Sequence, residues 1–263
     1  MGHDVRAKKH LGQHFLNDET IARQIVDALL EKDAESPLIE IGPGTGVLTQ
    51  HLIQLPRFYA LDVDEESVQF LKQKYPEHSA KILFRDFLEC DLNALAGPRF
   101  NVIGNFPYNI SSQIMFKVLE HKNQIPFVVG MFQKEVAERL AEKPGSKVYG
   151  ILSVLLQAFY DIEYLFTVHE QVFTPPPKVK SAVIRLQRNS RMTLPCDEVL
   201  FKQVVKTTFN QRRKTIRNSI RGLFNHNEVR HPLLDKRPEQ LSVEQFVELT
   251  LLVEGQLGSP AAE

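Results

Sequence analysis

The stretch Leu38-Ile39-Glu40-Ile41-Gly42-Pro43-Gly44-Thr45-Gly46 decides how the chain folds. Its first four residues read as a short buried strand, and Ser36-Pro37 breaks the helical pattern before it. The glycines allow a tight turn, and the apolar residues after Gly46 open a helix. A buried strand that passes through a glycine-rich turn into a helix brings free backbone N–H groups close to a ligand, and it is typical of α/β proteins.

Six further apolar segments read as strands, with segments of helical spacing between most of them. The predicted strands cover residues 58–62, 81–85, 100–104, 127–132, 162–168 and 181–186. The predicted helices cover residues 21–30, 47–53, 65–74, 111–119, 134–141 and 151–159. Asp18 is predicted to cap the N-terminus of the first of these helices, and Ser111 or Ser112 that of the fourth. This alternation predicts an α/β fold with a mostly parallel, seven-stranded sheet covered on both faces. The direct join of the last two strands predicts one antiparallel strand at the sheet edge.

The pattern changes near residue 188, and only helical signals follow it. These helices are predicted for residues 198–209, 214–224 and 243–254. Ser242 and Gln245 form a capping-box pattern before the last helix, and Gly255 is predicted to end it. We therefore predict an α/β domain over residues 1–188, with a basic segment at its start, residues 1–17. A small all-α domain is predicted over residues 189–263, with a disordered tail, residues 258–263.

Composition and cysteine count exclude several classes of protein. The chain has 263 residues, of which 43% are apolar and 24% charged, as in ordinary globular proteins. No apolar run reaches the roughly 18 residues of a membrane-spanning helix, and the polar N-terminus lacks the apolar core of a secretory signal. Two cysteines cannot build a disulfide framework, and the histidines show no metal-ligand spacing. We expect a cytoplasmic protein without a metal site.

Charge is balanced overall, with 32 Lys and Arg against 32 Asp and Glu, but it is segregated along the chain. The segment 1–17 carries several basic residues, including Lys8 and Lys9. No acidic residue lies between Glu198 and Glu228, and this window holds a run of cations: Arg212, Arg213, Lys214, Arg217 and Arg221. Such segregation favours RNA binding through these residues, although a charge run is also typical of a solvated helix face.

Acidic residues end the next two predicted strands after the glycine turn. Asp62 follows Gly42 by 20 residues, where a carboxylate reaches the ribose hydroxyls of a nucleoside cofactor. Asp86 ends the third strand and is placed to accept a hydrogen bond from an adenine amino group. The glycine spacing departs from the G-x-G-x-x-G dinucleotide motif, and no P-loop Gly-Lys-Ser/Thr follows. A nucleoside methyltransferase fits this spacing better than an NAD enzyme. A tight turn with a surface aspartate is the plainer alternative.

The turn Asn105-Phe106-Pro107-Tyr108 follows the fourth predicted strand directly. Pro107 fixes its own φ and pushes Phe106 toward extended geometry, so this turn is stiff. It holds a carboxamide, backbone carbonyls and an aromatic ring in one arrangement. These groups complement the two N–H donors and the π-face of an exocyclic amino group on a base. A turn with a buried aromatic residue is the alternative.

Four motifs occur in an order that resembles the ribosomal RNA adenine N6,N6-dimethyltransferase family, and in particular its bacterial small-subunit branch. They are Gly12-Gln13-His14-Phe15-Leu16-Asn17, the glycine turn 40–46, residues 104–111 and the proline-rich segment 173–181, and residues 209–218 extend the likeness. The resemblance implies a class I S-adenosylmethionine-dependent methyltransferase with a Rossmann-like sheet. It also implies a substrate, N6 of two adjacent adenines near the 3′ end of small-subunit (16S) rRNA, and a place in small-subunit maturation.

The resemblance also implies roles for single residues. The cofactor contacts would be His14, Leu16, Gly42, Gly44, Asp62, Asp86 and Asn105. The catalytic set would be Asn105, Pro107 and Tyr108, with Phe173 as a candidate to close the second face of the base. Phe106 stands where the family often has Leu, His14 where it often has Asn, and Asp62 where Glu is frequent.

Two other functions stay open. A large-subunit rRNA adenine N6-methyltransferase of the macrolide-resistance type shares the Asn-x-Pro-Tyr turn, and an RNA-binding assembly factor with a vestigial site would use the same basic surface. The proline-rich segment and the Arg-rich helical domain favour the small-subunit enzyme. The expected partner is small-subunit rRNA within the 30S particle, and we expect a monomer with no membrane contact and no obligate protein partner.

Overall fold

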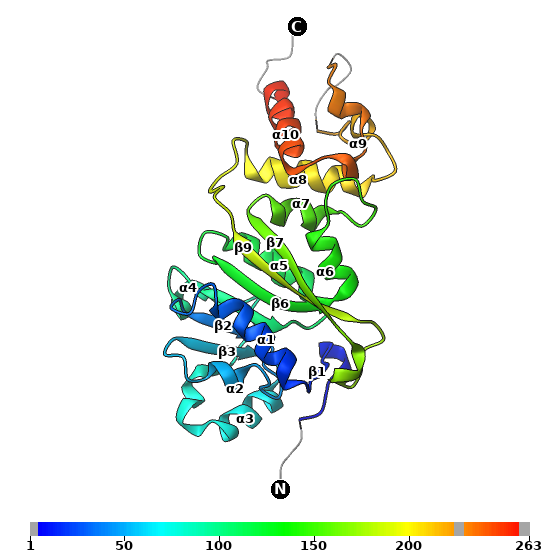
Figure 1. Cartoon of the computed structure of the whole chain (residues 1–263). Helices are drawn as coiled ribbons and strands as arrows, with labels where there is room; N and C mark the ends of the chain where they lie inside the picture. Colours follow the sequence, from blue (N-terminus) through cyan, green and yellow to red (C-terminus); the bar gives the residue numbers. More distant parts are fainter. Residues whose placement is uncertain (1–4, 224–228, 258–263) are drawn as a thin grey trace. The chain divides into compact units, whose positions relative to one another are not determined.

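The structure, a computed structural model, describes residues 5–223 and 229–257 (Figure 1). The chain divides into two compact units: residues up to 137 together with 161–188, and residues 138–160 together with those from 189 onward. The break after residue 188 coincides with the predicted one, but residues 138–160 belong to the second unit and not to the first. The reason is packing, because helix α7 (Ile151–Gln157) contacts helix α8 (Glu198–Asn210). In the same unit the centroids of the Tyr149 and Phe209 rings lie 6.1 Å apart.

A seven-stranded sheet with the order β4-β3-β2-β5-β6-β9-β7 forms the frame of the first unit. Its strands are β2 (Leu38–Ile41), β3 (Phe58–Asp62), β4 (Ile82–Phe84), β5 (Asn101–Asn105), β6 (Phe127–Gln133), β7 (Tyr160–Val168) and β9 (Ser181–Arg188). The neighbours from β4 to β6 pair in parallel, and β9 runs antiparallel to β6. The predicted α/β fold with a mostly parallel, seven-stranded sheet is therefore confirmed.

The antiparallel strand does not lie at the sheet edge, so that part of the prediction was wrong. β9 lies between β6 and β7, and β7 is the edge strand. Burial explains this order, because β9 has a run of fully buried apolar side chains that includes Val183 and Ile184. Only the first and last residues of β7 are buried. The interior strand β9 is thus the more completely buried of the two, and the edge strand β7 is partly exposed along most of its length.

The strand order reverses between β2 and β5, since β3 and β4 lie on one side of β2 and β5 and β6 lie on the other. Open sheets of this kind bind ligands at the carboxyl ends of the strands beside the reversal. Gly42 directly follows β2, and Asn105 ends β5. The fold thus brings the glycine turn and the Asn-Phe-Pro-Tyr turn to the same edge of the sheet.

Helices cover the sheet, and Figure 1 shows α1 in front of it and α5 behind it. The helices before α7 are α1 (Glu19–Leu30), α2 (Thr49–Leu52), α3 (Glu65–Lys74), α4 (Leu92–Ala96), α5 (Ser111–Glu120) and α6 (Lys134–Ala141). The Asp18 carboxylate accepts a hydrogen bond of 3.0 Å from the Ile21 N–H, which confirms the predicted cap. The predicted serine cap of α5 was wrong: Ile110 holds the cap position, and the Ser111 hydroxyl donates to the Tyr108 carbonyl.

The second unit is helical, as predicted, although two helices differ in length from the prediction. The middle helix is short, α9 (Ile216–Ser219), while α10 (Val243–Leu257) continues through Gly255. A glycine ends a helix by turning to positive φ, and Gly255 does not do so. The capping box is confirmed by reciprocal hydrogen bonds of 3.2 Å between Ser242 and Gln245.

The predicted end of the middle helix at Phe224 and the predicted disordered tail, 258–263, lie outside the described residues. Within the described ranges, no helix has both the length and the apolar character needed to cross a membrane.

Candidate active site

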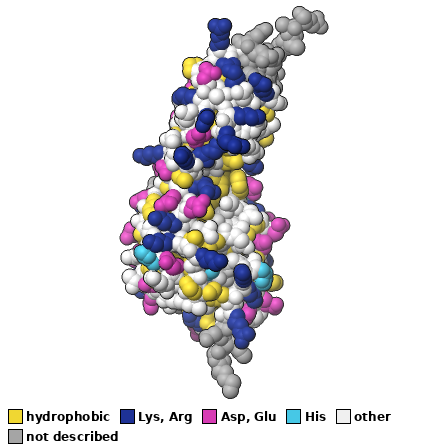
Figure 2. All heavy atoms as spheres, turned by 90° about the vertical axis from the view of Figure 1, so that its right-hand side faces the viewer, with side chains coloured by type: hydrophobic (Ala, Val, Ile, Leu, Met, Phe, Trp, Pro, Cys, Tyr) yellow, Lys and Arg dark blue, Asp and Glu magenta, His cyan; other side chains and the backbone are white. Residues whose placement is uncertain are grey.

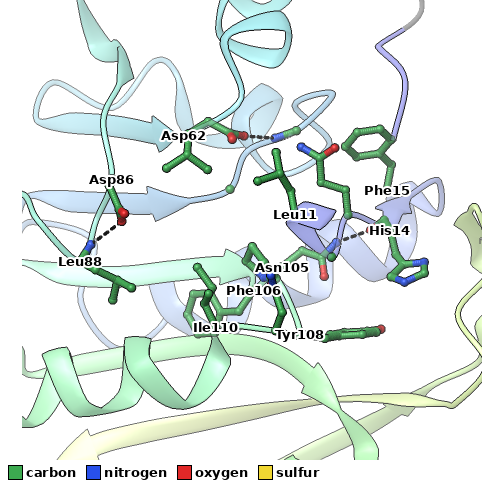
Figure 3. A pocket seen from close by; sticks show the side chains of 17 residues that line it. Leu11, His14, Phe15, Asp62, Asp86, Leu88, Asn105, Phe106, Tyr108 and Ile110 are labelled. Carbon is green, nitrogen blue, oxygen red and sulfur yellow. Dashed lines mark hydrogen bonds between the residues drawn. The ribbon is translucent and has the colours of Figure 1, made fainter. Parts of the chain in front are cut away.

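A cavity of about 270 Å³ lies at the carboxyl ends of β2 to β5, beside the strand reversal (Figure 3). Its walls come from the segments 11–15, 62–63 and 105–110, together with Gly42, Gly44, Asp86 and Leu88. We call it the acid-lined cavity, after Asp62 and Asp86. The sequence predicted this meeting of the glycine turn, the two strand-end acids and the Asn-Phe-Pro-Tyr turn.

Three positions of the glycine turn, Gly42, Gly44 and Gly46, have backbone conformations that favour glycine. Gly42 and Gly44 have φ values of 66° and 55°. A Cβ on Gly44 would lie 2.8 Å from the Phe15 ring, and a Cβ on Gly46 would lie 2.6 Å from a Leu71 methyl group. The conformation therefore favours glycine at all three positions, and at Gly44 and Gly46 the space excludes a side chain as well.

Asp62 is 6% exposed and is fixed by its own backbone environment. One carboxylate oxygen accepts from the Gly44 N–H at 3.2 Å, and the other accepts from the Asp64 N–H at 2.9 Å. Burial nevertheless raises the pKa of Asp62 to about 6, because the charged form loses its hydration. The two carboxylate oxygens of Asp62 are therefore held in a fixed orientation at the wall of the cavity, although burial destabilises their charged form.

Glu40, on the strand beside β3 and in register with Ala60, is buried more deeply than Asp62 and is not among the residues that line the cavity. Its carboxyl accepts a hydrogen bond of 2.8 Å from the Thr49 hydroxyl. Burial raises the pKa of Glu40 to about 8, and repulsion from Asp62 adds to the shift. Burial therefore favours the protonated form of Glu40 in the folded chain.

Asp86 lies two residues after β4, where the carboxylate accepts a hydrogen bond of 2.8 Å from the Leu88 N–H. Figure 3 shows this carboxylate at the side of the cavity opposite His14. The side chains of Val63 and Leu88 also line the cavity. Sequence reasoning missed these two residues, although an apolar residue directly after a strand-end acid is a signal that could have found Val63.

Asn105 is held by the N-terminal segment. Its side-chain N–H donates to the His14 carbonyl at 2.9 Å (Figure 3). Because the amide nitrogen donates to this carbonyl, the Asn105 side-chain oxygen is the atom of the amide that can accept a hydrogen bond from another group. The backbone after Asn105 is hydrogen-bonded as well. The Pro107 carbonyl accepts from the Ile110 N–H at 3.2 Å, which closes the turn, and the Phe106 N–H donates to the Met131 carbonyl at 3.2 Å.

Phe106 forms the floor beneath this turn. Its side chain is 1% exposed, and its ring packs edge-on against Phe132 with 5.1 Å between the centroids. The ring fits because β6 has a glycine there: a Cβ on Gly130 would lie 2.2 Å from it. A Cβ on Gly104 would meet the same ring at 2.8 Å. Two glycines on neighbouring strands therefore make the space that a residue larger than Leu requires.

Tyr108 shares the wall of the cavity with His14. The two rings are stacked, with centroids 5.3 Å apart and planes inclined by 28°. The Tyr108 hydroxyl is hydrogen-bonded to the Ser181 hydroxyl, and the His14 ring nitrogen Nδ1 lies 2.7 Å from the Pro175 carbonyl oxygen. These contacts fix the tyrosine ring from both its tip and one face.

Two predicted site residues do not reach the cavity. Phe173 is 3% exposed and Leu16 is 2% exposed, and both belong to the hydrophobic core. They face one another in register in a two-stranded sheet, β1 (Phe15–Leu16) and β8 (Phe173–Thr174). The structure thus does not place Phe173 on the second face of a base held by Tyr108. His14 is the aromatic residue that contacts Tyr108 instead.

Sequence reasoning also missed how the N-terminal segment is attached. Asp64 accepts a hydrogen bond of 2.9 Å from the Gln13 side chain and forms an ion pair with Lys8. Glu66 lies 3.4 Å from the same ammonium, and these acids raise the pKa of Lys8. Lys8, predicted to bind RNA, is therefore engaged in fixing the segment that carries Leu11 and His14 to the cavity.

The other predicted RNA-binding cations differ in their surroundings. Arg217 forms an ion pair of 3.4 Å with Asp235, and Arg212 donates to the Ser146 carbonyl at 3.3 Å. The remaining cations are exposed: Lys9, Arg213, Lys214 and Arg221. Figure 2 shows Lys and Arg side chains spread over one face of the second unit with few acidic ones between them.

Comparison with known proteins agrees with this geometry. The strand order and the glycine turn at the reversal define the class I S-adenosylmethionine-dependent methyltransferase fold. A family model described as ribosomal RNA adenine dimethylase matches residues 4–254. The chain belongs to this ribosomal RNA adenine dimethylase family.

Two relatives illustrate the similarity. A Parabacteroides distasonis protein named ribosomal RNA small subunit methyltransferase A is 58% identical over 262 residues, 98% of each chain. A Cytophaga hutchinsonii protein of the same name is 57% identical over 254 residues, 95% of this chain and 98% of the relative.

Two solved structures share the fold at 24% identity. A dimethyladenosine transferase from Plasmodium falciparum has a TM-score of 0.77 and covers 92% of this chain and 98% of its own. The 23S rRNA methyltransferase ErmE has a TM-score of 0.66 and covers 90% of this chain and 99% of its own.

Proposed function

We propose that this protein transfers methyl groups from S-adenosylmethionine to N6 of two adjacent adenines near the 3′ end of small-subunit rRNA, as part of small-subunit maturation. One observation carries the proposal. The Asn105 amide donates through its nitrogen to the His14 carbonyl, which leaves its oxygen as the group that can accept, and Asn105 lines the same cavity as Asp62 and the glycine turn. An acceptor held in this way, next to a nucleoside-type pocket, suits an amino group that is to receive a methyl group.

The residues of the acid-lined cavity fit the cofactor. Asp62 would accept hydrogen bonds from the ribose hydroxyls, and Asp86 would accept one from the adenine amino group. Val63 and Leu88 would contact the adenine, and the bare backbone at Gly42 and Gly44 allows close approach. The N-terminal segment is the remaining wall, with the His14 backbone bonded to Asn105.

The cofactor supplies a methyl group activated by its sulfonium. The protein's part is to hold the target nitrogen in line and to weaken its conjugation with the purine ring. The Asn105 oxygen would accept one N–H. The Phe106 carbonyl is the better second acceptor, because the Pro107 carbonyl already accepts from Ile110. Tyr108 would stack on the base, an interaction worth roughly 1–3 kcal/mol.

The small-subunit substrate is preferred over the large-subunit one because the relatives at 57–58% identity carry the small-subunit name. The ErmE structure, at 24% identity, supports the shared fold. An assembly factor with a vestigial site fits less well, because Gly42, Asp62, Asp86 and Asn105 all line one cavity.

We further propose that the chain acts as a cytoplasmic monomer, and that the exposed cations Lys9, Arg213, Lys214 and Arg221 contact RNA phosphates.

Methyl transfer to unmethylated small subunits tests the proposal. The purified chain is incubated with labelled S-adenosylmethionine and either ribosomal subunit, and modified positions are mapped by primer extension. We expect label in small-subunit rRNA and strong stops at two adjacent adenines near its 3′ end, because dimethylation blocks the pairing edge. Label in large-subunit rRNA would support the macrolide-resistance type. Particle binding without any label would support the assembly factor.

A further inference from the structure

A second hollow, of about 440 Å³, adjoins the acid-lined cavity. The two hollows share a wall made of Gly12, Gln13, His14 and Tyr108. Beyond this wall the second hollow is lined by Ala7, Lys9, Gln133 and residues 175–179. We call it the lysine-lined groove, after Lys9 and Lys178.

The groove has the opposite charge character to the cavity. Its lining contains no acidic side chain, whereas the cavity is lined by Asp62 and Asp86. Lys9 and Lys178 are exposed, and neither forms an ion pair with another residue of the described ranges. Two such ammonium groups on one hollow favour an anionic ligand.

The rest of the lining is flat and rigid. Pro175, Pro176 and Pro177 follow one another along one side, and the His14 imidazole lies 2.7 Å from the Pro175 carbonyl oxygen through Nδ1. Gln133, at the end of β6, adds an amide with both donor and acceptor capacity. Proline rings and the stacked His14–Tyr108 pair offer apolar faces to a planar group, and the Gln133 amide can form hydrogen bonds with the edge of that group.

We propose that the lysine-lined groove holds the nucleotide next to the target adenine, with Lys9 and Lys178 on the phosphates that flank it. This inference rests on the proposed function, because it takes the target base to lie on the cavity side of Tyr108. A polynucleotide that presents one base there has its neighbouring phosphate and base within the adjoining hollow. Single-stranded RNA is bound in this manner, by cations along the backbone and by flat side chains against the bases.

The test uses the full chain, unmethylated small subunits and four variants: Lys9→Gln, Lys178→Gln, the double variant and Lys32→Gln. Lys32 is an exposed lysine outside the groove and serves as the matched control. We expect the KM for the particle to rise roughly tenfold in the double variant, while kcat and the KM for S-adenosylmethionine stay within about twofold. The slope of log affinity against log salt is negative, and its magnitude should fall by about 1.4, since each contact to single-stranded RNA contributes about 0.7. Lys32→Gln should match the parent.

The outcomes separate this inference from the proposed function. A double variant with unchanged particle KM and unchanged salt slope overturns the inference even if methyl transfer is normal. So does a variant that loses only kcat. If the parent chain transfers no methyl group, the proposed function fails, and the salt slope of particle binding still decides whether the two lysines contact RNA.

Discussion

The acid-lined cavity and the lysine-lined groove lie on either side of the stacked His14 and Tyr108 rings, and they are built from different parts of the chain. The cavity is made at the strand reversal, where parallel strands end and place Asp62, Asp86 and Asn105 together. The groove is made by the N-terminal segment and the proline-rich segment, which are joined through β1 and β8. The sheet thus supplies the chemistry for a nucleoside cofactor, while two segments outside it supply the surface that suits a polyanion.

The largest effect is expected from Asn105→Ala, which removes the acceptor of the cavity and its bond to the His14 carbonyl. We expect kcat to fall at least about 100-fold, since misplacement of a reacting group by about 1 Å is worth this much. Affinity for the particle should change little, because the groove is untouched. Single-turnover methyl transfer and particle binding measure the two effects. Asn93→Ala, in the exposed part of α4, is the control.

Asp62→Asn should raise the KM for S-adenosylmethionine roughly tenfold, the size of a lost hydrogen bond to a charged group. The pH dependence gives a second readout. Because burial raises the pKa of Asp62 to about 6, the carboxylate is lost as the pH falls through this value. In the parent chain, kcat/KM for the cofactor should therefore decline below about pH 6, and this decline should be absent in the variant. A decline of the same size in both would show that another group is titrating.

Gly130→Ala tests the floor of the cavity without touching a charged group. Its Cβ would meet the Phe106 ring, and overpacking of this kind costs about 1–3 kcal/mol of unfolding free energy. Phe106→Leu in the same chain should restore part of the loss, because the smaller side chain vacates the contact. Denaturant unfolding of both single variants and the double variant measures the coupling. Gly222→Ala, which has open space around it, should change the unfolding free energy by less than about 0.5 kcal/mol.

The smallest effect on activity is expected from Glu40→Gln, which should act on stability. The folded pKa of Glu40 lies at about 8, above its ordinary value of 4.5, so the folded chain holds this proton more tightly than the unfolded chain. The free energy of unfolding should therefore decline as the pH rises from about 4.5 to about 8. The variant should show a shallower decline in denaturant unfolding across this range, whereas the exposed Glu31→Gln should not. Equal slopes in the parent and in Glu40→Gln would contradict the assignment.

The sequence predicted the cavity well because its parts follow from local rules. Strands alternate with helices, parallel strands end at one edge, and Gly42, Asp62, Asp86 and Asn105 each follow or end a strand. The positive φ values of Gly42 and Gly44 and the Asp18 cap are equally local. Residues with these signals lie where they were expected.

The groove and its wall could not be predicted in this way, because their contacts join distant segments. The Gln13–Asp64 and Asn105–His14 hydrogen bonds connect residues 51 and 91 positions apart. Phe173, a candidate for the second face of the base, lies in the core, since its register opposite Leu16 depends on the pairing of β1 with β8. No periodicity marks such a pairing. The assignment of residues 138–160 to the helical unit depends in the same way on aromatic packing between Tyr149 and Phe209.

The most direct test of the central claim is a crystal structure of the full chain with S-adenosylhomocysteine. We predict that the ligand lies in the acid-lined cavity, with its ribose hydroxyls on Asp62, its adenine amino group on Asp86 and its sulfur directed toward Asn105. A ligand bound in the lysine-lined groove, or one that makes no contact with Asp62, would contradict the account.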